Sequence, residues 1–184
     1  MAKLLESIRQ FFIPPPDEYD PSGDSELFHA SAGVRQFSHS FRTVQLPSAQ
    51  NAEQPVPLDD SARALFKLAE EIRENAYAKY SGFRVGAALL TASGKVYLGV
   101  NTENASYPAG LCAERAAISA AVTAGEREFT AIAICGGLAT EPCFPCGICR
   151  QVLSEFCGAD FPVILSNGIY PLRNLLPFAF SLSE

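Results

Sequence analysis

The sequence predicts an α/β fold of three layers, a mixed central sheet between layers of helices. Segments with helical spacing alternate with short apolar runs rich in Val, Ile and Leu, in the order α-β-β-α-β-α-β. The 184 residues, 48% of them hydrophobic, can bury one core and do not require a second domain.

The first expected helix runs from Leu58 to Ala76, where apolar residues recur at helical spacing and Asp59 or Asp60 can cap the start. Two β-prone runs, 85–90 and 95–100, flank turn residues and predict a hairpin. This pair begins the sheet.

The second half of the chain supplies the remaining elements. An Ala-rich stretch from Cys112 to Ala124 predicts a helix that stops at Gly125. Further along, residues 130–137 predict a buried strand, 146–156 an amphipathic helix, and 161–166 a strand closed by Asn167-Gly168.

Residues 1–57 differ in character from the rest. They carry Pro14 to Pro16, Pro55 and Pro57, and they have no sustained hydrophobic period. We expect a Pro-rich N-terminal extension, flexible or draped over the protein, followed by one folded domain over 58–184.

Charge and hydropathy indicate a soluble protein with a small-molecule partner. A net charge of −6 argues against a protein that binds nucleic acid mainly through its phosphates. No window approaches the run of about 18 apolar residues that a membrane span needs. The first residues include Glu6 and lack the apolar core and cleavage site of a secretion signal, so we expect a cytoplasmic location.

The six cysteines all lie in the C-terminal half, and Cys143, Cys146 and Cys149 lie within seven residues. In a chain without an export signal, such crowding predicts metal ligands before disulfides. Cys112-Ala-Glu114 followed by Pro145-Cys-Gly-Ile-Cys149 matches the zinc deaminase pattern with cysteine in the first place. Ligands Cys112, Cys146 and Cys149 would leave a fourth position open, as in catalytic zinc sites.

The predicted helices place these thiols at helix N-termini, where the positive end of the dipole stabilises thiolate. Glu114, two residues after a ligand, can reach a zinc-bound water. Arg115 adjoins the ligands, and we expect it to hydrogen-bond a thiolate sulfur and offset the negative charge of the cluster.

Two alternatives to this zinc site remain open at the level of sequence. A structural zinc ribbon would use Cys143 as a fourth ligand, and Glu114 would then be a solvated carboxylate. Pro142-Cys143-Phe144-Pro145-Cys146 is itself an overlapping Pro-Cys-x-x-Cys. Gly147, the Arg150-Gln151 continuation and a helix that starts at Cys146 favour the downstream register.

From about Leu58 to Ser181 the chain resembles the homotetrameric cytidine deaminases that have three-cysteine zinc sites. Five stretches carry the resemblance: YSGFRVGAAL from Tyr80, GVNTENASYPAG from Gly99, LCAERAAI from Leu111, PCGICRQVLSEF from Pro145 and LLPFAF from Leu175. It implies a cytidine deaminase-like fold, Zn²⁺ as cofactor, and hydrolysis of cytidine and 2′-deoxycytidine in pyrimidine salvage.

The resemblance also implies roles for single residues. Glu114 would be the proton shuttle, and Asn101 and Glu103 would hydrogen-bond the ribose 3′-hydroxyl. The backbone N–H of Ala113 would hold the pyrimidine 2-oxo group. Phe83 would pack on the base or sugar. Phe180 would reach into the site of a neighbouring subunit of a homotetramer.

Each outer residue also has a plainer interpretation. Asn101 and Glu103 could cap the turn after a strand, and Phe83 and Phe180 could be core aromatics. Three rival functions are a nucleoside-antibiotic deaminase, a nucleic-acid-editing deaminase and a non-enzymatic zinc module. The pair Asn101 and Glu103 argues against the first, and the negative net charge argues against the second. Glu114 argues against the third, in which it would have no role.

Overall fold

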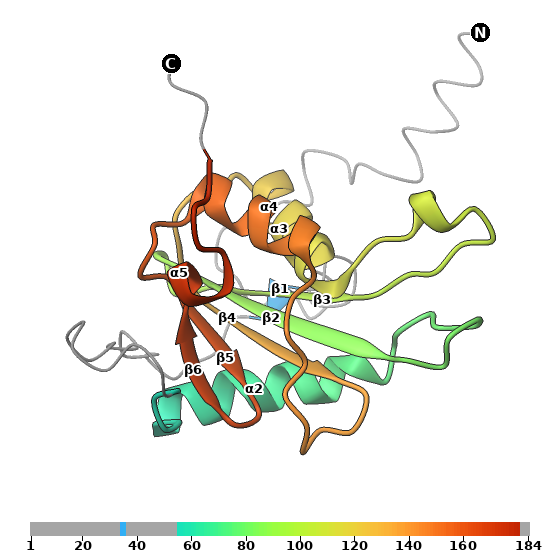
Figure 1. Ribbon diagram of the computed structural model, residues 1–184, viewed down its shortest axis with the longest axis horizontal. Coiled ribbons are helices and arrows are strands. Elements are labelled where there is room, and N and C mark those ends of the chain that lie inside the picture. Colours follow the sequence, from blue (N-terminus) through green and yellow to red (C-terminus); the bar gives the residue numbers. More distant parts are fainter. Residues whose placement is uncertain (1–33, 36–54, 181–184) are drawn as a thin grey trace, which may run out of the picture. The chain divides into compact units, whose positions relative to one another are not determined.

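A computed structural model describes residues 34–35 and 55–180. Its described strands form one sheet in the order β1-β3-β2-β4-β5-β6 (Figure 1). In this part of the chain β4 pairs with β5 in parallel, and every other neighbouring pair is antiparallel. The strands are β1 (Val34–Arg35), β2 (Val85–Thr91), β3 (Val96–Val100), β4 (Phe129–Gly136), β5 (Pro162–Leu165) and β6 (Gly168–Pro171). The predicted mixed sheet is confirmed.

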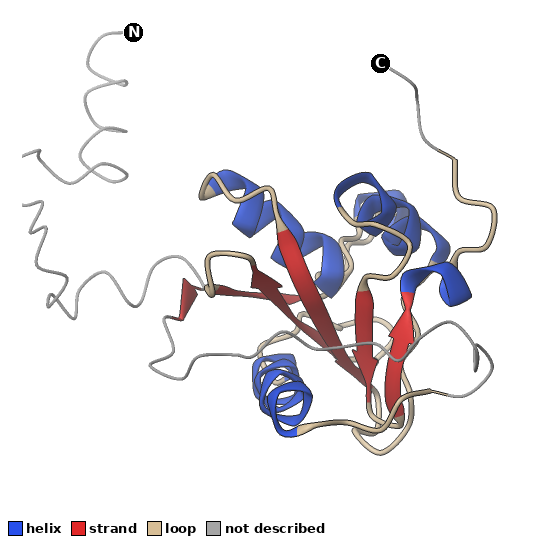
Figure 2. Ribbon diagram, turned by 90° about the vertical axis from the view of Figure 1, so that its left-hand side faces the viewer, coloured by secondary structure: helices blue, strands red, loops and turns tan. Residues whose placement is uncertain are grey.

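Helices lie on both faces of this sheet. Helix α2 (Asp60–Arg73) covers one face, and α3 (Ala113–Thr123), α4 (Gly147–Phe156) and α5 (Leu172–Leu175) lie on the other (Figures 1 and 2). A short 3₁₀ helix, η4 (Tyr107–Ala109), lies in the loop before α3. The three-layer prediction is therefore confirmed. Among the described residues, every helix is too short or too polar to cross a membrane.

The apolar core has one cluster on each face of the sheet. In β4, Ile132 and Ile134 belong to the cluster shared with α3 and α4, whereas Ala133 and Cys135 belong to the cluster shared with α2. Successive strand residues point to opposite faces, so one strand supplies both clusters. The continuous apolar run that predicted a buried strand reflects this burial on two sides.

Two glycines bring helices unusually close to the sheet. A Cβ on Gly99 of β3 would lie 2.2 Å from the carbonyl oxygen of Ala113, in the first turn of α3. Gly86 of β2 is similarly placed against α2, 2.1 Å from the carbonyl oxygen of Ala69. Only glycine permits such backbone approach. Gly99 thereby fixes where the start of α3 sits.

The helix ends follow the expected cap signals closely. The Asp59 side chain accepts a 2.7 Å hydrogen bond from the backbone N–H of Ala62, so Asp59 is the N-cap of α2. This helix ends at Arg73, three residues before the predicted end. Gly125, with φ +90°, follows α3 as predicted.

The C-terminal part differs from the sequence prediction. Asn167-Gly168 does not end the sheet, because Gly168 pairs with Leu165 and opens the further strand β6. Helix α5 follows it directly.

Residues near the start of the folded part also join the sheet. Val56 exchanges backbone hydrogen bonds of 3.0 and 2.8 Å with Ile169 of β6. Strand β1 pairs with the other edge through β3. The predicted extension over 1–57 lies otherwise outside the described residues.

Candidate active site

Three cysteine thiols converge where two helices begin on the same face of the sheet. Cys112 is the N-cap of α3 and Cys146 the N-cap of α4, while Cys149 lies in the first turn of α4 and is buried. Their sulfur atoms all lie within 4.8 Å of one another. Cys112 Sγ is 3.8 Å from Cys146 Sγ, which is 3.4 Å from Cys149 Sγ. Within residues 55–180 this group holds three donors and no fourth.

The thiols interact strongly with one another. A hydrogen bond from Cys149 and further contacts from Arg115 and Cys146 lower the pKa of Cys112 to about 5. The same interaction with Cys112, together with burial, raises the pKa of Cys149. One thiolate in this group is thus stabilised by its neighbours while ionisation of the next is opposed. A divalent cation held by the three sulfurs would remove that opposition, since a metal-coordinating thiol is deprotonated outright.

Arg115 lies in the first turn of α3 beside this cluster. Its Nη2 donates to Cys112 Sγ at 3.7 Å and to the carbonyl oxygen of Gly110 at 3.1 Å. The side chain thus brings positive charge to the thiolate and fastens the loop that precedes the first ligand. Its Nε is buried and has no hydrogen-bond partner among the described residues.

Glu114 lies beside the thiols and is 4% exposed. Burial raises the pKa of its carboxyl above the ordinary value, and the charge on Cys112 acts in the same direction. A glutamate carboxyl is almost never fully buried in a protein unless it is paired with another group. Its position two residues after Cys112, on the first turn of the same helix, places it next to the metal ligands.

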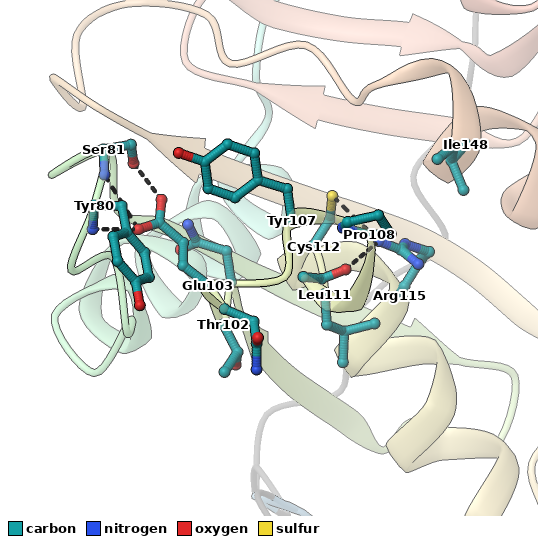
Figure 3. A pocket seen from close by; sticks show the side chains of 13 residues that line it. Tyr80, Ser81, Thr102, Glu103, Tyr107, Pro108, Leu111, Cys112, Arg115 and Ile148 are labelled. Atoms are coloured by element: carbon teal, nitrogen blue, oxygen red, sulfur yellow. Dashed lines mark hydrogen bonds between the residues drawn. The ribbon is translucent and has the colours of Figure 1, made fainter.

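A pocket of about 510 Å³ opens onto Cys112. Figure 3 shows Tyr80, Ser81 and Glu103 at one end of this pocket and Cys112 and Arg115 at the other. Asn101 also lines it, and Tyr107 and Ile148 contribute exposed apolar surface. The predicted residues Asn101, Glu103 and Cys112 therefore share one cavity.

Asn101 and Glu103 also hold loop backbone in place, which agrees with their alternative interpretation as residues that cap a turn. The Asn101 side chain accepts from the backbone N–H of Val85 at 2.8 Å and donates to the carbonyl of Phe83 at 2.9 Å. Glu103 accepts from the N–H of Tyr80 at 2.7 Å and of Ser81 at 3.1 Å, and from the Ser81 hydroxyl. Both side chains hold the loop before β2 against the pocket.

The three remaining predicted residues, Ala113, Phe83 and Phe180, lie at different places in the fold. Ala113 is buried at the first position of α3, where backbone N–H groups have no partner within the helix. Phe83 is half exposed, and its ring covers Gly137, where a Cβ would lie 2.6 Å from the ring. Phe180 lines a separate cavity of about 420 Å³ with Cys157. Within one chain, Phe180 is therefore apart from the thiols.

Cys143 stands outside the group of three thiols. Its sulfur packs close to Gly136 at the end of β4, and burial raises the pKa of its thiol to about 11. What separates Cys143 from the ligands is its position, because its sulfur is not among the three that converge. The geometry thus favours the downstream register and leaves a four-sulfur site without its fourth donor among the described residues.

Sequence reasoning did not single out Tyr80 and Ser81 as pocket residues. Their backbone N–H groups and the Ser81 hydroxyl hold Glu103 at the end of the cavity away from Cys112. Pairing of Tyr77 with Thr102 brings the two loops together. This long-range pairing has no signature in local hydrophobic periodicity, because each partner is a single bridge residue.

The chemistry of the donor set fits zinc. Thiolates are soft ligands that suit Zn²⁺, and three protein ligands with an adjoining cavity are typical of catalytic rather than structural zinc sites. Fold and site together define an α/β protein with a zinc centre, a buried carboxylate beside it and a small-molecule pocket.

Comparison with known proteins agrees with this class. The family of the cytidine and deoxycytidylate deaminase zinc-binding region matches residues 59–165. The chain belongs to this family, and Zn²⁺ is its cofactor. It is 46% identical over 126 residues to the cytidine deaminase of Sporosarcina psychrophila, covering 65% of this chain and 91% of that protein.

Solved structures give the same result. Cytidine deaminase from Burkholderia pseudomallei superposes with a TM-score of 0.61 at 47% identity, over 64% of this chain and 98% of that one. The Mycobacterium tuberculosis cytidine deaminase gives a TM-score of 0.63 at 39% identity, over 67% and 100% of the two chains. The predicted cytidine deaminase-like fold is confirmed.

Proposed function

We propose that this chain hydrolyses cytidine and 2′-deoxycytidine to uridine and 2′-deoxyuridine and releases ammonia, as a step of pyrimidine salvage. The observation that carries the proposal is the buried carboxylate of Glu114 beside three convergent thiols. One of these thiols, Cys112, lines a pocket together with Asn101 and Glu103. The named relatives are cytidine deaminases, which supports the same reaction.

Cys112, Cys146 and Cys149 would hold the zinc, whose chemistry is to acidify water at neutral pH. Glu114 accepts a proton from the attacking water and delivers it to ring N3, while the oxygen adds to C4 of the pyrimidine. A tetrahedral intermediate forms on the base. Glu114 then takes the proton of the new C4 hydroxyl and delivers it to the 4-amino group, which leaves as ammonia while C4 becomes the uracil carbonyl. Burial favours this role because it brings the carboxyl's pKa closer to neutrality.

The pocket has spare hydrogen-bonding capacity for a nucleoside. One Asn101 amide hydrogen remains after its bond to Phe83, and the Glu103 carboxylate can accept one further donor. These groups are suited to the ribose 3′-hydroxyl. The N–H of Ala113, which has no acceptor within its own helix, is suited to the 2-oxo group. Phe83 would pack on the base or sugar, although within one chain it is not among the residues that line this pocket.

The remaining candidates are less well supported. A nucleoside-antibiotic deaminase has no need of a ribose-binding pair such as Asn101 and Glu103. An editing deaminase needs a basic groove, whereas Arg115 is the only cation among the residues that line this pocket and it is already bonded to Gly110 and Cys112. We also propose a cytoplasmic location.

We propose a homotetramer with composite active sites. The segment after α5 carries Phe178 and Phe180, which are 102% and 67% exposed. Tyr107 and Ile148 at the rim of the pocket are 78% and 62% exposed. These two exposed apolar surfaces line different cavities of one chain, and both are candidates for contact with a neighbouring subunit. Phe180 of one subunit would stack on the base bound in another.

An ultraviolet assay of the zinc-loaded protein tests the substrate assignment. Loss of the cytosine absorption is expected with cytidine and with 2′-deoxycytidine, together with one ammonia per nucleoside. CMP should turn over far more slowly, because no free cation in the pocket can bind its phosphate. Deamination of CMP in preference to both nucleosides would reject the proposal.

A further inference from the structure

Each of the two helices that carry the thiols also carries an arginine in its first turn. Arg115 of α3 donates to the carbonyl of Gly110, and Arg150 of α4 donates through Nε to the carbonyl of Pro145 at 2.7 Å. In both cases the carbonyl lies five residues earlier, two residues before Cys112 in the first case and one before Cys146 in the second. An arginine-to-carbonyl hydrogen bond thus holds the backbone that precedes a zinc ligand at the start of each helix.

Arg150 differs from Arg115 in its second contact. Arg115 bonds the Cys112 sulfur, whereas Arg150 Nη1 donates to the carbonyl of Leu175, the last residue of α5, at 2.7 Å. The adjoining Gln151 donates to the carbonyl of Phe180 at 3.3 Å. Two consecutive residues of α4 therefore hold the segment 175–180 on the helix that supplies Cys146 and Cys149.

Electrostatics make the position of Arg150 unusual. A cation in the first turn faces the positive end of the helix dipole. The first turn of α4 contains no acidic residue, and Arg150 is bonded to carbonyl oxygens and forms no ion pair within the described residues. Its two bonds to carbonyl oxygens, at the start of α4 and at the end of α5, therefore hold it in this position.

We propose that Arg150 is a positioning residue that couples the C-terminal segment 175–180 to the zinc site. It fixes Pro145, and so the thiol of Cys146, against the end of α5. The same side chain then determines both the geometry of the zinc ligands and how rigidly the segment that carries Phe180 is held. This inference rests on the zinc ligands proposed above.

The test compares Arg150→Gln and Arg150→Lys with the unsubstituted full-length zinc protein. Arg127→Gln is the matched control, because Arg127 also bonds two carbonyls, those of Val122 and Glu126, at the far end of α3. Two readouts are the rate of zinc transfer to a chromogenic chelator and amide hydrogen exchange over residues 172–180. Peptides from α2, on the other face of the sheet, report general loosening.

Arg150→Gln should speed zinc transfer about 10- to 100-fold, the usual effect of removing an outer contact of a metal site. Exchange should rise over 172–180 and not in α2. Arg150→Lys should give an intermediate result, because one ammonium cannot bond both carbonyls in the same fixed geometry. Arg127→Gln should match the unsubstituted protein.

The inference is overturned if Arg150→Gln matches Arg127→Gln in both readouts, or if exchange rises equally in α2. Should Arg150→Gln not fold, Arg150→Lys decides by the same two measurements. Cys149→Ala separates this inference from the proposed function. Zinc retained by Cys149→Ala rejects the ligands themselves, whereas zinc lost there with a normal Arg150→Gln rejects the positioning role alone.

Discussion

At the scale of single residues, the carboxyl of Glu114 has a balance of forces that suits proton transfer. Burial and the charge on Cys112 raise its pKa, while Cys149 and Arg115 pull it down. These opposing influences act on one carboxyl that lies beside the thiols, so its pKa is raised by burial without the group losing its contact with the cluster. General acid–base groups work best when their pKa lies near the operating pH.

Glu114→Gln should keep zinc and fold but lose turnover by about 10²- to 10⁴-fold or more, because the amide fills the same space and cannot accept the proton. Metal analysis and the ultraviolet assay measure the two quantities on one preparation. A near-normal turnover number in the zinc-loaded variant would reject the shuttle role.

The two overlapping Pro-Cys-x-x-Cys motifs make a second prediction at this scale. Cys149→Ala should lose zinc, because its buried sulfur belongs to the group of three thiols. Cys143→Ala should retain it, since the sulfur of Cys143 packs on Gly136 and lies outside that group. Zinc content of the two purified variants decides, and the reverse contents would move the site three residues upstream.

At the scale of elements, the sequence predicted the structures that carry the chemistry. Helices α3 and α4 begin where the cysteine motifs begin, as the Ala-rich run of the first and the amphipathic run of the second predicted. The four-residue elements β6 and α5 were missed, since neither is long enough to show a period.

The missed contacts of the site share one physical cause. Ser81 meets Glu103, and Arg150 meets Leu175, only after distant segments fold together. Such contacts belong to the tertiary structure and leave no spacing to read in the chain. The resemblance to a family supplied the outer residues Asn101 and Glu103, which the residue pattern alone left as turn caps.

The close approach of β3 and α3 makes a prediction about an element. Gly99→Ala would place a methyl group 2.2 Å from the Ala113 carbonyl, so the start of α3 must move with Cys112 and Glu114. Overpacking of this kind costs about 1–3 kcal/mol of stability. We expect lower thermal stability, weaker zinc binding and reduced turnover.

Gly158→Ala is the control for this substitution, because a Cβ there meets no atom within 4 Å. Calorimetry and metal analysis should leave the control unchanged. A Gly99→Ala protein with normal stability and zinc content would mean that α3 is not fixed by this contact.

At the scale of the whole molecule, the family match and the buried core both begin after residue 58. Deleting residues 1–55 should therefore leave zinc content and turnover close to those of the full chain. Val56, which pairs with β6, is retained in this variant. A truncated protein that binds zinc and is inactive would place part of the site within residues 1–55.

The last prediction concerns assembly. Within one chain Phe180 lies away from the thiols, exposed and held at its backbone by Gln151, so its ring is presented outward. Stacking of an aromatic ring on a base contributes about 1–3 kcal/mol. Phe180→Ala should therefore raise KM by about tenfold or more while zinc content stays normal, if the ring completes a neighbour's pocket.

Sedimentation at several protein concentrations measures the assembly directly, and a tetramer is expected. Mixed tetramers give a sharper test, because Phe180→Ala and Glu114→Gln damage different partners of one composite site. Co-refolding the two inactive or weakened chains should restore sites that combine an intact Glu114 with an intact Phe180 from another subunit. An active monomer in which Phe180→Ala has normal kinetics would remove the composite site and leave the chemistry at zinc unaffected.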